Sequence, residues 1–168
     1  MIATSTVVMF FLMYQAVYSL DHSLFSETRM WSSVVMGAVM ALIMLGFMWS
    51  MYRGNATKMA VIAGMMVVGA AALWLVRSQE TIDDVAYMKA MIPLHSIAIL
   101  TSRRAQIHDP RVRRLADGII EAQVKEIAEM KMLIDDIDRN GLRNSTKLPG
   151  RSAAMTPAMA AEAQTAVR

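Results

Sequence analysis

Two stretches in the second half of the chain, 87–98 (YMKAMIPLHSIA) and 119–130 (IIEAQVKEIAEM), decide the predicted fold. Each has the three- and four-residue apolar spacing of an amphipathic α-helix. Each also carries nitrogen, oxygen or sulfur side chains where such a helix buries hydrocarbon. Met91 and His95 hold these positions on the first helix, and Gln123, Glu126 and Met130 hold them on the second. These two helices are therefore where we look for a functional site.

Local signals predict the ends of both helices. Thr81-Ile82-Asp83-Asp84 has the form of a capping box and predicts a helix that continues to about residue 107. Asp109 as N-cap and Pro110 at the first helical position predict a second helix to about residue 139, stopped by Asn140-Gly141. Residues 77–140 are therefore predicted to form an antiparallel helical hairpin.

The second helix of this hairpin has an apolar stripe with two polar interruptions. The stripe consists of Val112, Leu115, Ile119, Gln123, Glu126, Met130, Leu133 and Ile137. A single hairpin buries too little surface to be stable alone, so we expect two copies to dimerise into a four-helix bundle. Residues 141–168 are rich in Ala, Ser, Thr, Pro and Arg without apolar periodicity, and they predict a flexible tail.

The first 76 residues have the composition of a membrane anchor. The chain has 168 residues, of which 55% are hydrophobic and 18% charged, and most of the charge lies after residue 76. Residues 1–20, 31–52 and 59–76 are each close to the roughly 20 apolar residues that cross a bilayer as a helix. The predicted fold class is therefore all-α, with three transmembrane helices followed by the hairpin.

Charge in the short loops predicts the orientation in the membrane. Arg53 and Lys58 place the turn 53–58 in the cytoplasm, so the N-terminus is predicted to be cytoplasmic and the hairpin to lie on the outer face. Asp21, His22 and Glu27 then meet at the outer membrane surface, near Arg77. Two interpretations remain open: ion pairing of Asp21 or Glu27 with Arg77, and a secondary metal site that uses Asp21, His22 and Glu27.

Antiparallel packing of the hairpin is expected to bring together Met91, His95, Glu126 and Met130. Thioether sulfur with imidazole nitrogen favours copper in its Cu(I) state, and the chain contains 18 methionines and no cysteine. A buried carboxylate binds a cation, pairs or becomes protonated. The alternative is therefore a hydrogen-bonded His95–Glu126 pair that fixes the register of the bundle without a metal.

A set of spaced residues resembles the domain of unknown function 305 family, in its membrane subgroup with three transmembrane helices. The matching residues are Met91-Ile92-Pro93, His95, Ala98, Asp109-Pro110, Leu115-Ala116, Ile119-Ile120, Gln123, Glu126-Ile127 and Met130, together with Asp21-His22 and residues 25–29 near the front of the chain. The resemblance implies a ferritin-like hairpin on a protein of the bacterial inner (plasma) membrane, exposed on the periplasmic or outer face. Some members of this family bind copper.

The chain departs from the family pattern at two expected ligand positions. Leu94 stands where the family has the first of two adjacent histidines, and Thr101 stands where it has a methionine. The resemblance therefore carries His95 over to this chain, with Met91, Glu126 and Met130 as further candidate ligands.

The motifs predict a protein that is not an enzyme. The sequence shows no nucleophile with a paired base, no phosphate loop and no pair of Glu-x-x-His motifs. No aromatic residues alternate with the arginines, so nucleic acid is not an expected partner. The predicted function is copper binding for tolerance or storage. The alternative is a structural or accessory membrane subunit that has lost the metal site, with the membrane, a second copy and a membrane-protein partner as its contacts.

Overall fold

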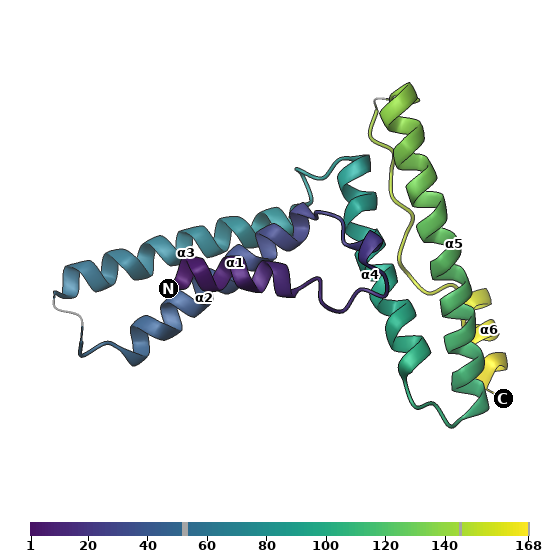
Figure 1. The fold of residues 1–168 in the computed structure, drawn as a ribbon, viewed down its shortest axis with the longest axis horizontal. Helices are drawn as coiled ribbons and strands as arrows, with labels where there is room; N and C mark the ends of the chain where they lie inside the picture. Colours follow the sequence, from purple (N-terminus) through teal and green to yellow (C-terminus); the bar gives the residue numbers. More distant parts are fainter. Residues whose placement is uncertain (52–53, 145, 168) are drawn as a thin grey trace. The chain divides into compact units, whose positions relative to one another are not determined.

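The computed structural model describes residues 1–51, 54–144 and 146–167. Every regular element in these ranges is helical, which confirms the all-α class. The elements are α1 (Ile2–Leu12), the 3₁₀ helix η1 (Leu20–His22), α2 (Glu27–Phe47), α3 (Asn55–Ser78), α4 (Asp84–Arg104), α5 (Pro110–Asn140) and α6 (Pro157–Val167). The chain divides into two compact units, Met1–Ile97 and Ala98–Arg168. The first unit contains α1, α2, α3 and the start of α4 (Figure 1).

Helices α2 and α3 form the centre of the first unit and pack against each other. They have 21 and 24 residues with mean hydropathies of 2.0 and 2.3, so each is long and apolar enough to cross a bilayer. Small residues allow their close approach: Ala38 is 4% exposed, and a methyl group on Gly69 would meet it at 3.4 Å. These helices correspond to the predicted spans 31–52 and 59–76, although α2 begins earlier and ends at Phe47. Tyr52, at the end of the predicted span, lies outside the described residues.

The predicted first span, 1–20, differs from the structure because α1 ends at Leu12. Eleven residues extend about 16 Å as a helix, roughly half of a hydrocarbon core. Beyond the helix, the Arg29 side chain contacts the residues that follow α1. Its Nη1 donates to the Met13 carbonyl at 2.8 Å, and its guanidinium lies 4.6 Å from the Tyr14 ring centroid. The Tyr14 hydroxyl in turn accepts from the Ser26 amide at 3.0 Å. These contacts hold residues 13–26 in a folded loop against the start of α2.

The third helix with the length and composition of a membrane span is α4, which the sequence assigned to the hairpin. Its mean hydropathy of 1.2 is lower than that of α2 and α3. Asp83, rather than Thr81 of the predicted capping box, caps it, because Asp83 Oδ1 accepts from the Ala86 amide at 2.7 Å. The helix continues through Pro93 and ends at Arg104, three residues before the predicted end.

Helix α5 begins and ends as predicted. Asp109 Oδ1 accepts from the Arg111 amide at 2.8 Å, Pro110 is the first helical residue, and Gly141 follows the last turn with φ of +76°. The predicted tail contains an additional helix, α6. Thr156 caps α6 by accepting from the Met159 amide at 3.3 Å, and the alanine-rich sequence that follows has high helix propensity. The sequence analysis missed α6 because the segment lacks a wide apolar face.

Candidate functional site

The predicted ligands Met91 and His95 lie one turn apart on α4, within the first unit. His95 Nδ1 is 3.0 Å from the Met91 carbonyl oxygen. Because a carbonyl can only accept, this contact places a proton on Nδ1. A ring N–H that donates to a carbonyl fixes the orientation of the imidazole, as is common in metal-binding histidines.

Ser96, which follows His95, anchors the segment between α1 and α2 on α4. Its side chain is completely buried, and its Oγ accepts from the Tyr18 amide at 2.7 Å. The same Oγ is 3.0 Å from Nδ1 of His22. A serine hydroxyl that accepts one bond has its own proton to donate, so Ser96 can satisfy His22 Nδ1, with the His22 proton on Nε2.

His22 therefore lies against α4, and Asp21 is exposed beside it. His22 Nε2 is 3.7 Å from Asp21 Oδ2, and the Ser19 hydroxyl also donates to Asp21. Glu27 is in the first turn of α2 and does not complete a cluster with them. Across the described ranges of the chain, no three His, Asp or Glu side chains are grouped closely enough to hold a metal ion.

The other two predicted ligands, Glu126 and Met130, are one turn apart on α5 and belong to the second unit. Glu126 is exposed and Met130 is partly buried. The buried residues of α5 are Ala116, Ile127 and Ile134. None of them belongs to the predicted stripe, but each directly follows a stripe residue in the sequence. Three residues of the predicted stripe are at least about half exposed in the single chain: Val112 (49%), Leu115 (66%) and Leu133 (51%).

The two positions where this chain departs from the expected ligand pattern carry side chains that serve other roles. Leu94 is 51% exposed on α4. The Thr101 hydroxyl donates to the Ala98 carbonyl at 3.1 Å, a bond within its own helix. Neither residue supplies a sulfur or nitrogen ligand.

Ser96 and its two partners, Tyr18 and His22, were not predicted from the sequence. A signal was present, because Ile92, Ser96 and Ile99 share the spacing of one buried helix face, and a polar residue there needs a partner. The partners themselves are 78 and 74 residues away, at Tyr18 and His22. Helical periodicity carries no information about contacts over such separations.

The described part of the chain is thus all-helical, with three helices long and apolar enough to cross a membrane, of which α4 carries Met91 and His95. The sequence model of a family described as a domain of unknown function (DUF305) matches residues 28–134 and, in a second alignment, 84–167. The chain belongs to this family. Both matches include α4 and most of α5, the region that carries the predicted ligands.

An uncharacterized protein of Acanthamoeba polyphaga mimivirus is similar to this chain. It is 34% identical over 104 residues, which are 58% of this chain and 68% of the viral protein. No solved structure matches the chain.

Proposed function

We propose that this chain is a protein of the bacterial inner membrane that binds Cu(I) for copper tolerance or storage. Helices α4 and α5 would form its ferritin-like hairpin on the outer face of the membrane. The observation that carries the proposal is the His95 Nδ1 contact with the Met91 carbonyl at 3.0 Å. This contact fixes the orientation of the imidazole on a helical turn that also bears the Met91 thioether.

The donor groups fit a soft metal. Imidazole nitrogen and thioether sulfur suit Cu(I), whereas hard cations such as Mg²⁺ prefer oxygen. His95 and Met91 would hold the metal on α4, and Glu126 and Met130 are the candidate donors on α5. The proposed dimer supplies each of these groups twice.

The position of α1 supports the proposed orientation. Ile2 lines a cavity together with Thr57 and Lys58, so the N-terminal end of α1 lies at the same end of the first unit as the basic turn before α3. A cytoplasmic turn therefore favours a cytoplasmic N-terminus, with the chain beyond α3 on the outer side. The charged residues of α4, including Asp84, Lys89 and Arg103, favour its location outside the hydrocarbon.

A Cu(I) titration tests the metal proposal. The full chain, purified in mild detergent, is titrated against a competing Cu(I) chelator beside His95→Ala and Leu94→His, with His108→Ala as the matched control on an exposed histidine. We expect stoichiometric binding by the parent chain and by His108→Ala, loss in His95→Ala, and tighter binding in Leu94→His. A parent chain that leaves all Cu(I) with the chelator would contradict the proposal.

The second candidate is a structural or accessory membrane subunit without a metal. The half-exposed apolar residues of α5 favour this function because a partner helix would bury them. Under this candidate, His95→Ala weakens the dimer, as measured by sedimentation in detergent, and metal content has no effect. Under the copper proposal the dimer persists and only the bound copper falls.

A further inference from the structure

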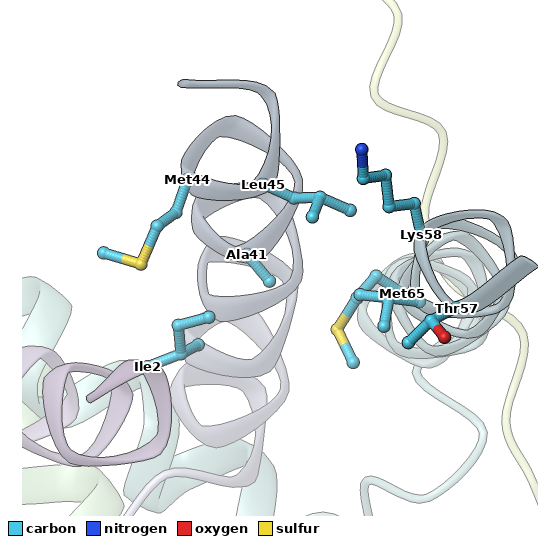
Figure 2. Close-up of a pocket in the computed structure, with 8 residues that line it drawn as sticks. Ile2, Ala41, Met44, Leu45, Thr57, Lys58 and Met65 are labelled. Carbon is cyan, nitrogen blue, oxygen red and sulfur yellow. The ribbon is translucent and has the colours of Figure 1, made fainter. Parts of the chain in front are cut away.

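A cavity of about 320 Å³ lies between α1, α2 and α3, near the start of α3. Its wall is mainly apolar and includes Ile2, Ala41, Leu45 and Met65, so all three helices contribute. Figure 2 shows Ala41 and Leu45 on the side of α2 that faces α3, with Met65 and Lys58 on α3 across the gap. Its volume is at the lower end of the range for small-molecule sites.

Among the described residues that line the cavity, Lys58 is the one cationic side chain, and the rest of the lining is mainly apolar. Lys58 is only 7% exposed, and its Nζ lies 4.6 Å from the centroid of the Trp49 ring. None of the ion pairs among the described residues includes Lys58. The ring face compensates part of the cost of removing an ammonium group from water, but it supplies no counter-charge.

An apolar cavity with a single cation is complementary to an amphiphile that has an alkyl chain and an anionic head. Thr57, the residue before Lys58 on α3, also lines the cavity. The cavity is formed by the helices proposed to cross the membrane, next to the turn proposed to be cytoplasmic. Basic pockets at this depth bind anionic lipid head groups, which are enriched in the cytoplasmic leaflet.

We propose that this cavity binds an anionic phospholipid of the surrounding bilayer, with its phosphate on Lys58 and part of an acyl chain against Leu45 and Met65. The inference rests on the membrane location in the proposed function, and it is independent of copper. It assigns a role to Lys58 and to the cavity, neither of which is part of the candidate metal site.

Trp49 provides the reporter for a test because it lies against Lys58. The full chain, with Trp31→Phe and Trp74→Phe to leave one tryptophan, is placed in phosphatidylcholine nanodiscs. Small amounts of phosphatidylglycerol or phosphatidylcholine, brominated near the glycerol end of one acyl chain, are then added. We expect the anionic lipid to quench Trp49 at a mole fraction about fivefold lower than the neutral lipid, the factor expected for one lysine near an anionic head group.

Variants separate the charge from the fold. Lys58→Gln should bring the ratio of the two lipids close to one, and Lys58→Arg should keep the preference for the anionic lipid. Arg77→Gln is the matched control, since Arg77 is an exposed basic residue at the other end of α3. It should keep the preference as well.

Several results would overturn the proposal. Equal quenching by the two lipids in the parent chain, or an undiminished preference in Lys58→Gln, would exclude a site built on Lys58. Displacement of the brominated phosphatidylglycerol by excess oleate would identify a free fatty acid as the occupant. If neither brominated lipid quenches Trp49, the membrane location itself fails, and the lipid site fails with it.

Discussion

Ser96 carries a single hydroxyl that contacts two residues of one segment far away in the sequence, Tyr18 and His22. It accepts from the Tyr18 amide at 2.7 Å, lies 3.0 Å from His22 Nδ1, and is fully buried. A buried donor that loses its acceptor retains the full cost of its desolvation. The bond is therefore more important for the position of residues 18–22 than its net strength would suggest.

We predict that Ser96→Ala destabilises this attachment by about 1 kcal/mol, the net contribution of a typical hydrogen bond, because the Tyr18 amide and His22 Nδ1 both lose the hydroxyl that they contact. Hydrogen exchange at the Tyr18 amide in detergent should accelerate, and the segment 13–26 should become more sensitive to protease. Ser32→Ala is the control, since the Ser32 hydroxyl donates only to the Thr28 carbonyl of its own helix at 2.8 Å. Unchanged Tyr18 exchange in Ser96→Ala would show that the backbone there is held by other contacts.

At the scale of single elements, the N-terminus of α5 is capped by a charged pair, Asp109 and Arg111. Asp109 accepts from the Arg111 side chain at Nε (3.1 Å) and Nη2 (2.7 Å), and from the Arg111 amide at 2.8 Å. These hydrogen bonds, with the side-chain bonds first in importance, lower the pKa of Asp109 below its ordinary value. The ionised carboxylate is therefore part of the helix cap.

A lowered pKa in the folded state means that the unfolded chain binds this proton more readily as the pH falls. The stabilisation by Asp109 is thus fully present above about pH 4, the ordinary pKa of the side chain, and is lost as the pH falls through the lower folded value. We predict that the protection of the first amides of α5 against hydrogen exchange, measured relative to the intrinsic rate at the same pH, falls over this acid range in the parent chain. Asp109→Asn still caps the helix but does not titrate, so that pH dependence should disappear. If it persists in Asp109→Asn, another group is responsible.

The elements also show which features of the fold the sequence determines locally. The ends of α5 were predictable, because Asp109, Pro110 and Gly141 act within a turn of their own positions. The end of α1 was not, because it depends on Arg29, sixteen residues from the Met13 carbonyl that it binds. The candidate site divides in the same way. The Met91–His95 contact follows from helical spacing, whereas the attachment of His22 to Ser96 depends on tertiary packing.

For the molecule as a whole, self-association depends on what covers the apolar face of α5. In the second unit, α6 lies beside α5 (Figure 1), and its Ala163 and Ala166 line a cavity of about 780 Å³ together with Val112, Leu115 and Ile119. Small alanine side chains cover this face incompletely, since Leu115 remains 66% exposed. The residues beside α6 are the same ones that the proposed dimer would bury.

We therefore predict that α6 competes with the second copy of the chain for the first half of α5. Truncation after residue 156 should remove the competitor, and the dimer should form at a lower protein concentration, as measured by sedimentation velocity in detergent. Leu115→Lys in the truncated chain is the control, because a charge in the contact should return the chain to the monomer. A truncated chain with unchanged self-association would mean that α6 does not protect this face. A truncated chain that dimerises less would mean that α6 is itself part of the interface, because its surface would then be needed for the contact between copies.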